Sequence, residues 1–399
     1  MGAVSSHCPM MIKNSAVSSV FVVFMKPFSA YNYLVSAELS VFLLEKPSFV
    51  ENRFKNVQPK KVSAFMDFKN VTIQDIAETA NVSKSTVSRV INNSTPVADK
   101  KRKAVLDAME KLNFQPNIFA RGLAGGQSMT IGIVTQNIGS PFYDNVAQGI
   151  IYGLRSSIYA PVFVDGQWKA EVEEQVIQTL LGRHVDGLII VGGSLSEEKT
   201  VQLAEQKPII MVARHVEALK ERCIYIDNFN AAYQATRFLI EAGHENIAHL
   251  TGIRRHQDAT RRYKGYCQAL SDGNLELNPD LVIEGNFSGQ SGVMGVESLL
   301  MRGHSFTAMF AANDEMAYGA RLALYRKGIR VPEDISIIGF DGQPNSAFMT
   351  PPLTTVRQPA LEMGQAAAEA LVGLLTDGEF ELPDLKPDLV IRESVSRRR

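Results

Sequence analysis

Residues 84–89 hold the side chains of this chain that are best suited to recognition chemistry. Five polar or basic residues fall on one face of a predicted helix: Lys84, Ser85, Thr86, Ser88 and Arg89. Val87, Val90 and Ile91 fall on the opposite face at helical spacing. Hydroxyl, ammonium and guanidinium groups donate hydrogen bonds to phosphates and to base edges. The pattern therefore predicts a helix that contacts nucleic acid.

A preceding helix and a tight turn must position this face. Thr72, with Asp75 three residues later, resembles a capping box and predicts a helix that opens near Ile73. Asn81 adopts the left-handed backbone of a turn at low cost, and Ser83 is suited to cap the next helix. Two short helices joined in this way fit the major groove of DNA. The segment therefore predicts a helix-turn-helix DNA reader.

Positive charge is concentrated around this segment. The whole chain of 399 residues has a formal net charge of -1. Residues 67–128 hold nine basic and six acidic side chains, which gives the segment a net charge of +3. Local positive charge supports contact with phosphates. The run from Lys100 to Lys103, taken alone, is typical of a solvated surface.

The rest of the chain alternates between predicted strands and predicted helices. Amphipathic stretches at 174–181, 316–324 and 363–375 predict helices. Continuous apolar strands separated by helices imply parallel sheets that are covered on both faces. We therefore predict an α/β core of two Rossmann-like lobes behind an all-α headpiece. The apolar runs that predict strands are 131–134, 161–164, 187–191, 209–212, 224–226, 247–250, 308–311 and 335–340.

Polar side chains follow several of these predicted strands. Asp165, Arg214, Asn313 and Asp341 each stand just beyond the end of an apolar run. Folds of this class bind ligands beyond the carboxyl ends of their strands. The sequence therefore predicts a ligand cleft that these side chains line.

Several other function classes find no support in the residues. The sequence has no G-x-S-x-G, P-loop or HExxH motif, so we expect no catalytic residues, no enzyme activity and no cofactor. Its three cysteines, Cys8, Cys223 and Cys267, lie far apart, which argues against a disulfide framework or a metal site and fits a reducing cytoplasm. A secreted sugar-binding protein would share the predicted core but not the helix-turn-helix.

Residues 1–66 form a separate extension. Its apolar patches, 17–24 and 33–44, are shorter than the roughly 18 to 20 apolar residues of a membrane span, so we expect no membrane partner. No clear signal-peptide cleavage site follows them. Our leading hypothesis is that Met66 is the true start, and the alternative is a real, mostly disordered extension.

Residues 67–395 resemble the lactose/galactose repressor (LacI/GalR) family of bacterial transcriptional regulators. The resemblance implies a headpiece at 67–115, a hinge at 116–128 and, at 129–399, an effector-binding and dimerisation core of the periplasmic-binding-protein type I fold. The motifs that carry it are TIQDIAETANVSKSTVSRVINN, LNFQPNIFARGLAGGQS, TIGIVTQNIGSPFYDNVAQGI, AGHENIAHLTG, AANDEMAYGA, VPEDISIIGFDG and PPLTTVRQP.

For the headpiece, the resemblance implies that Lys84, Ser85 and Arg89 read the operator. Arg89 is suited to bidentate contact with guanine, whereas Lys84 donates either to guanine or only to phosphate. Thr72, Thr86 and Ser88 are expected at phosphates or in helix caps. Ala98 stands where the family often has a capping serine, so we expect the third helix to begin at Asp99.

For the hinge, the resemblance implies a helix from Asn117 through Ala124 that folds on the operator. Leu123 matches a leucine that is wedged into the minor groove, where it kinks the duplex. Gly122 lowers the intrinsic stability of such a helix by roughly 1 kcal/mol relative to alanine. A plain flexible linker would suit the glycines equally well.

For the core, the resemblance implies a set of effector contacts whose chemistry suits a sugar. Carboxylate, amide and guanidinium groups bind hydroxyls, and aromatic faces cover the apolar side of the ring. Asp341 as a helix cap, Phe142 as a core residue and Arg214 in an interlobe ion pair are the alternatives. The implied effector-binding residues are Phe142, Tyr143, Arg214, Arg262, Phe287, Asn313 and Asp341.

Together these features predict a repressor of carbohydrate genes. The chain ends at SRRR without leucine heptads, so we expect a homodimer that reads a palindromic operator of double-stranded DNA. A small sugar is the expected effector, and it releases the protein from DNA. The alternative is a corepressor of the nucleobase type, which promotes DNA binding instead.

Overall fold

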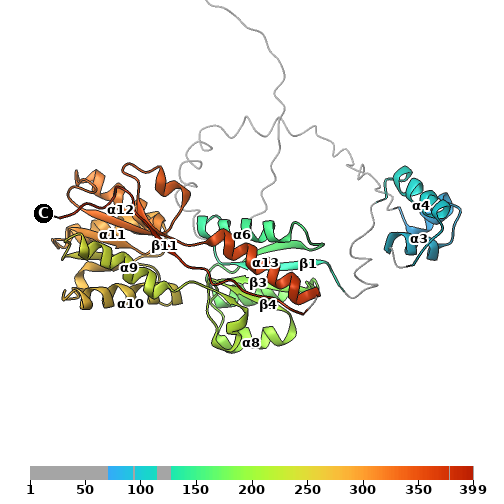
Figure 1. The fold of residues 1–399 in the computed structure, drawn as a ribbon, viewed down its shortest axis with the longest axis horizontal. Coiled ribbons are helices and arrows are strands. Elements are labelled where there is room, and N and C mark those ends of the chain that lie inside the picture. The colour runs from blue at the N-terminus through green and yellow to red at the C-terminus, as the bar shows by residue number, and fades with distance from the viewer. Residues whose placement is uncertain (1–70, 93–94, 115–126, 377, 399) are drawn as a thin grey trace, which may run out of the picture. The chain divides into compact units, whose positions relative to one another are not determined.

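The computed structural model describes residues 71–92, 95–114, 127–376 and 378–398 (Figure 1). The extension at 1–66 lies outside the described residues. So do Asn117, Leu123 and Ala124 of the predicted hinge. The described parts are a small helical headpiece and a larger α/β core, as the sequence predicted.

Three short helices form the headpiece. They are α2 (Ile73–Thr79), α3 (Lys84–Asn92) and α4 (Asp99–Lys111), so the predicted starts near residue 73 and at residue 99 are confirmed. Asn81 takes the left-handed backbone of the turn, with φ of 52°. The three helices pack against one another around a small core, whose buried side chains are Ile76, Ala77, Val87, Val90, Val105 and Ala108.

The first lobe of the core is built on a five-stranded parallel sheet. Its strands run in the order β2-β1-β3-β4-β5, so the chain starts near the middle of the sheet and winds outward in both directions. The strands are β1 (Thr130–Thr135), β2 (Ala160–Asp165), β3 (Gly187–Val191), β4 (Ile209–Val212) and β5 (Cys223–Ile224). The helices are α6 (Pro141–Leu154), α7 (Ala170–Gly182), α8 (Glu197–Gln206) and the 3-10 helix η2 (Glu217–Arg222).

The second lobe is built on a six-stranded sheet in the order β11-β10-β9-β8-β6-β7. All neighbours are parallel except β10 and β11. The strands are β6 (Ile247–Thr251), β7 (Val282–Glu284), β8 (Ala308–Ala311), β9 (Ser336–Asp341), β10 (Thr354–Arg357) and β11 (Asp388–Val390). The helices are α9 (Asn228–Glu241), α10 (Gln257–Asp272), α11 (Gly289–Met301), α12 (Asp314–Arg326) and the 3-10 helices η3 (Pro279–Leu281) and η4 (Pro344–Ala347).

One helix from the C-terminal part of the chain returns to the first lobe. The helix α13 (Ala360–Thr376) follows β10 of the second lobe, yet it packs on α6, β3 and β4 of the first (Figure 1). After α13 the chain goes back to the second lobe, where β11 pairs with β10. The two lobes are therefore connected by more than one passage of the chain.

The contact between α6 and α13 depends on glycine. A Cβ atom at Gly149 would lie 2.0 Å from the carbonyl oxygen of Leu361, and one at Gly364 would lie 2.0 Å from that of Val146. These distances are far shorter than any real contact. The two helix backbones therefore touch directly, which a larger residue at either position would prevent.

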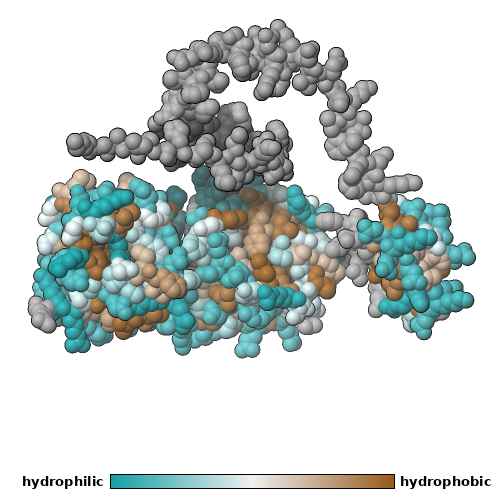
Figure 2. Space-filling model, turned by 90° about the horizontal axis from the view of Figure 1, so that it is seen from above, coloured by the Kyte–Doolittle hydropathy of each residue, from teal (hydrophilic) through white to brown (hydrophobic). Residues whose placement is uncertain are grey.

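The described residues include no helix that is both long and apolar enough to cross a membrane. Hydrophilic side chains cover much of the face drawn in Figure 2, with apolar groups interspersed among them.

We predict that Gly149→Ala lowers the free energy of unfolding by about 1–3 kcal/mol, because the added Cβ forces α6 and α13 apart. Urea unfolding followed by far-ultraviolet circular dichroism measures the change. Gly182→Ala, at the end of α7, is the matched control because a Cβ there meets nothing within 4 Å. Equal stability of the two variants would contradict the proposed helix contact.

Candidate functional site

The polar face of α3 lies on the surface of the headpiece. Lys84, Ser85 and Arg89 are exposed, whereas Thr86 and Ser88 are half-buried. Thr72 is exposed just before α2. The structure therefore brings the predicted base-reading residues together on one exposed helix face.

Ser83 organises the first turn of α3. Its Oγ atom lies 2.9 Å from Oγ of Ser85 and 2.9 Å from Oγ1 of Thr86, and it accepts a hydrogen bond of 3.3 Å from the Thr86 amide. The Ser83 hydroxyl therefore caps the first turn of α3, and the Thr86 hydroxyl lies against it. The exposed cations Lys84 and Arg89 are the charged groups that this face presents.

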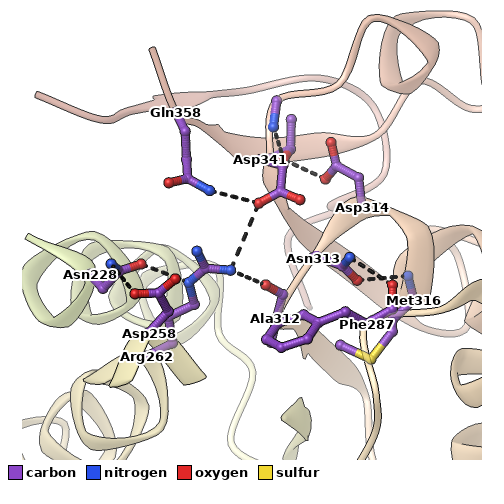
Figure 3. Close-up of polar contacts among 12 residues, drawn as sticks. Asn228, Asp258, Arg262, Phe287, Ala312, Asn313, Asp314, Met316, Asp341 and Gln358 are labelled. Atoms are coloured by element: carbon purple, nitrogen blue, oxygen red, sulfur yellow. Dashed lines mark hydrogen bonds and ion pairs between the residues drawn. The ribbon is translucent and has the colours of Figure 1, made fainter. Parts of the chain in front are cut away.

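A buried cation organises the polar end of the second lobe (Figure 3). Arg262 on α10 is only 3% exposed. Its Nε atom donates to Oδ1 of Asn228 at 2.8 Å, and its Nη1 atom donates to the carbonyl oxygen of Ala312 at 2.5 Å. The guanidinium also lies 3.8 Å from Oδ1 of Asp341 and 3.6 Å from the centre of the Phe340 ring. The Arg262 side chain of α10 thus contacts the start of α9, the residue that follows β8 and the end of β9.

Asp341 ends β9 in a strained conformation. Its φ of 105° lies in a region that residues with a side chain rarely adopt. Its carboxylate accepts a hydrogen bond of 2.8 Å from Nε2 of Gln358, and the cap residue of η4 is Gln343. Burial raises the pKa of Asp341 to about 6, although Arg262 opposes this shift. Asp341 therefore faces the buried polar side chains around Arg262, which include Asn228 and are here named the polar cluster, and it does not cap the next helix.

Asn313 already has structural partners in this conformation. Its Oδ1 atom accepts a hydrogen bond of 3.0 Å from the Met316 amide and thereby caps α12. Its Nδ2 atom donates to the carbonyl oxygen of Phe287 at 2.9 Å. Phe287 has a φ of 66°, and its ring lies directly against Gly252. Asn313 thus positions an aromatic side chain that the sequence also predicted for the effector site.

Asp314 belongs to the same polar cluster, although the sequence analysis did not single it out. It is fully buried and accepts hydrogen bonds from the Gln343 amide at 2.8 Å and from the hydroxyls of Ser346 and Thr355, both at 2.6 Å. Burial raises its pKa to about 7. The only signal in the sequence was its position next to Asn313, because its partners are distant along the chain.

Aromatic rings form a second group of side chains where the two lobes meet. The Phe142 and Tyr143 rings, at the start of α6, lie 5.4 Å apart, and Tyr143 lies 6.0 Å from Trp168. Trp168 then stacks on His256 of the second lobe at 3.9 Å. The His256 ring is nearly parallel to that of Phe287, 6.2 Å away. The rings therefore form a continuous row from one lobe to the other.

Two further features of this row bear on the predictions. Phe142 is partly buried and packs against the main apolar core, which agrees with the core alternative, and its predicted contact with an effector stays a prediction. Trp168, the single tryptophan of the chain, was not predicted, although its position just beyond β2 is that of a cleft residue. Burial raises the pKa of Tyr143, and the nearby carboxylates Asp258 and Asp341 add to that shift.

Arg214 lies beyond β4 in the first lobe. Its Nη2 atom donates to the carbonyl oxygen of Leu195, which belongs to the same lobe. Burial lowers the pKa of Arg214 and raises that of Glu173, which lies nearby. Asp165 is the last residue of β2, and its carboxylate accepts hydrogen bonds from the amides of Ile138, at 3.0 Å, and Gln167, at 2.8 Å.

The two lobes also meet beside the aromatic row. The Oε1 atom of Gln257 accepts a hydrogen bond of 3.1 Å from the His215 amide. With the stack of Trp168 on His256, this contact joins the carboxyl edges of both sheets. No cluster of three or more side chains suited to a metal ion occurs within the described residues.

Comparisons with known protein families give one match in the headpiece and one in the core. The profile for "Bacterial regulatory proteins, lacI family" matches residues 72–117, and the profile for "Periplasmic binding protein-like domain" matches residues 236–395. The first match covers the headpiece helices. The second covers most of the second lobe together with α13.

Curated relatives match over nearly their whole length. The ribose operon repressor of Haemophilus influenzae is 34% identical over 326 residues, which cover 81% of this chain and 98% of the relative. The HTH-type transcriptional repressor PurR of Aliivibrio salmonicida is 34% identical over 336 residues, which cover 82% of this chain and 99% of the relative.

Solved structures of transcriptional regulators also match most of this chain. The lac repressor dimer bound to operator and the anti-inducer ONPF has a TM-score of 0.74 and 30% identity, and the match covers 82% of this chain and 99% of that one. The complex of the transcriptional regulator CelR with cellobiose has a TM-score of 0.61 and 31% identity, with 81% and 99% covered.

We predict that Asp341→Asn changes the pH dependence of stability. Since the pKa of Asp341 is about 6 rather than the ordinary 3.8, the folded protein binds this proton more tightly than the unfolded chain. The contribution of this group to the free energy of unfolding therefore falls as pH rises from about 4 to about 6. The variant should gain stability relative to wild type between these values, as measured by urea unfolding at several pH values.

The comparison with wild type is essential to this experiment. Burial lowers the pKa values of His249 and His256 to about 4, so their contributions are lost as pH falls, which is the opposite direction. Both proteins share these histidines, so the difference between the two curves reports on Asp341 together with its effect on Asp314, whose pKa the Asp341 carboxylate helps to raise. A difference that stays constant across this range would refute the assigned pKa.

Proposed function

The chain belongs to the lacI family of bacterial regulatory proteins, and we propose that it is a cytoplasmic repressor of carbohydrate genes that a small sugar releases from its operator. The observation that carries the proposal is that one chain combines an exposed helix face of basic and hydroxyl side chains with a separate, buried group of polar side chains and aromatic rings. Its relatives are transcriptional repressors, so we expect binding rather than catalysis.

On the DNA side, α3 would lie in the major groove with Lys84 and Ser85 near base edges. Arg89, further along the same exposed face, would donate two hydrogen bonds to a guanine. Thr72, Thr86 and Ser88 would contact phosphates or maintain the helix cap. A homodimer would place two such headpieces on the half-sites of a palindromic operator, with Asn117, Leu123 and Ala124 in a hinge at the minor groove.

On the effector side, the polar cluster and the aromatic row match the two kinds of surface that a sugar presents. Asp341 would accept hydrogen bonds from hydroxyls, while Arg262 and Asn313 would donate to ring or hydroxyl oxygens. Phe142, Tyr143 and Phe287 would cover the apolar face of the ring. Arg214 would add a donor from the first lobe.

The two sites would communicate through the relative positions of the lobes. A sugar shifts this equilibrium only if it binds the state that releases DNA more tightly than the state that binds DNA. Contacts across the cleft, such as that between Trp168 and His256, are the ones that an effector between the lobes would change.

A second candidate is a corepressor-dependent regulator that takes a nucleobase. The similarity to PurR proteins favours this alternative. The aromatic row would also stack on a flat base. We prefer the sugar because two carboxylates, Asp258 and Asp341, lie at the polar end of the site, and acceptors of this kind suit a ligand rich in hydroxyls.

We predict that Arg89→Ala removes about 1–3 kcal/mol of discrimination between the operator and a scrambled duplex, because the bidentate contact to guanine is lost. Fluorescence anisotropy with an operator selected from random duplexes by the full chain measures both affinities. Lys111→Ala, exposed in the last turn of α4, is the control and should keep the discrimination. Intact discrimination in the Arg89 variant would disprove the assigned reading role.

We predict that Asp341→Ala keeps operator affinity within about twofold but abolishes release by sugar. The substitution removes an effector contact that lies outside the headpiece. The same anisotropy assay, run with a panel of neutral sugars and a panel of purine bases, measures the effect. If only a purine changed operator affinity of the wild type, and raised it, the corepressor alternative would replace the sugar.

A further inference from the structure

One carboxylate holds the point at which the chain enters the core. The predicted hinge ends at residue 128, and β1 begins at Thr130. Oδ1 of Asp186 accepts a hydrogen bond of 2.8 Å from the Ser128 amide, and Oδ2 accepts one of 2.7 Å from the Met129 amide. Asp186 stands just before β3 and is only 9% exposed. Both oxygens of a nearly buried carboxylate therefore bind the last two residues before the sheet.

Further hydrogen bonds close this junction around the carboxylate. The Asp186 amide donates to the carbonyl oxygen of Thr130 at 2.8 Å, and the Ala160 amide donates to that of Met129 at 2.9 Å. The Ser128 hydroxyl accepts a hydrogen bond of 3.2 Å from the Thr130 amide. Hydrogen bonds to a charged group are stronger than those between neutral groups. The two bonds to the Asp186 carboxylate therefore contribute most to holding the junction.

Met129 adopts a backbone conformation that needs such support. Its φ of 53° lies in the left-handed region, which residues with a side chain rarely adopt. A conformation of this kind persists only where the surrounding contacts fix it. Here Asp186 binds the amide of Met129, and Ala160 binds its carbonyl oxygen. Tertiary contacts, and not local preference, therefore set the direction in which the chain leaves the core.

The first sheet does not require this carboxylate. Strand β1 lies between β2 and β3, and it pairs with β2 over residues 130–135 and with β3 over residues 131–134. Its two neighbours therefore hold β1 along its length. Asp186 adds restraint to the residues outside the sheet, on the side of the chain that leads to the headpiece.

The carboxylate is itself carried by a rigid part of the first lobe. Val185, the preceding residue, is fully buried, and its amide donates to the carbonyl oxygen of Leu180 at 3.4 Å. Strand β3, which begins directly after Asp186, is buried throughout and packs against α13. A displacement of this part of the lobe would therefore carry the end of the hinge with it.

The position of this junction matters for a dimer that reads a palindrome. Two headpieces can bind one operator only if the dimer holds them at the separation of its half-sites. Each flexible residue would add up to about 3.3–3.6 Å to the reach of a headpiece. We infer that Asp186 is a positioning residue that fixes where the hinge leaves the core and thereby sets the half-site spacing that the dimer accepts. The inference rests on the proposed function, because it assumes that two headpieces bind one operator.

An operator with altered spacing tests this role. Two base pairs inserted at the centre of a selected palindromic operator separate its half-sites by about 7 Å more and rotate them by about 70°. Fluorescence anisotropy of the full chain with both duplexes measures the ratio of the two affinities. The wild type should bind the lengthened operator at least about tenfold more weakly than the original.

Variants of Asp186 should narrow this ratio. Asp186→Ala should reduce it to about threefold or less, because slack at both junctions accommodates the longer spacing. Asp186→Asn, which keeps one acceptor oxygen, should give an intermediate ratio. The loss of a negative charge affects binding to both duplexes alike, so the ratio excludes that effect.

Asp334→Asn is the matched control. The Asp334 carboxylate also accepts a hydrogen bond from a backbone amide, that of Arg330, at 2.8 Å, but it precedes β9 in the second lobe. This variant should keep the wild-type ratio. Urea unfolding verifies that each variant is folded, and Asp186→Asn remains informative if Asp186→Ala does not fold.

The positioning role and the proposed function fail in different ways. A ratio that both Asp186 variants share with the wild type would overturn the positioning role while the proposed function stood. Equal affinity of the wild type for the two duplexes would also overturn it, because the dimer would then not read spacing. If the wild type selected no preferred sequence from random duplexes, the proposed function and the positioning role would both be wrong.

Discussion

The burial of one positive charge, that of Arg262, is the constraint on which the proposed effector site depends. Removing a guanidinium from water is costly unless hydrogen bonds and opposite charge replace the solvent. Here Asn228, the Ala312 carbonyl and Asp341 supply the replacement. Because these groups come from three other elements, the cation holds the ends of α9, β8 and β9 around a single point. The strained backbone of Asp341 persists within this frame.

The two lobes contribute different chemical groups to the proposed effector site. The second lobe contributes carboxylates and the buried Arg262, whereas the first contributes the rings of Phe142, Tyr143 and Trp168. A ligand with one apolar face and hydroxyls around its edge would match both sets of groups. The stack of Trp168 on His256 lies where the lobes meet, so an effector bound between the lobes would contact these rings.

The path of the chain also connects the two lobes of the core. The helix α13 packs in the first lobe, whereas β10 before it and β11 after it lie in the second. A shift of one lobe relative to the other must therefore move the two segments that connect α13 to these strands. The direct backbone contact at Gly149 and Gly364 leaves little freedom between α6 and α13. Movement is therefore expected between the lobes rather than within the first lobe.

Much of the architecture was predictable because it follows from local rules. Periodicity and capping located α2, α3 and α4, and the eight apolar runs correspond to β1 to β6, β8 and β9. The three remaining strands were missed. Strands β7 and β11 have only three residues each, and β10, with four, begins with two threonines, so none produces a long apolar run. The antiparallel pairing of β11 is likewise a property of the sheet and not of the segment.

The amino-acid sequence by itself determined the two-part organisation, the exposed face of α3 and the polar residues at the strand ends. These features depend on the spacing of apolar and polar residues within short segments of the chain. The tertiary structure alone decided that Trp168 and Asp314 join the residues of the proposed site. Their partners, His256 and Thr355, lie 88 and 41 residues away along the chain. No local pattern specifies which distant groups will share a buried environment, since that depends on how the elements pack.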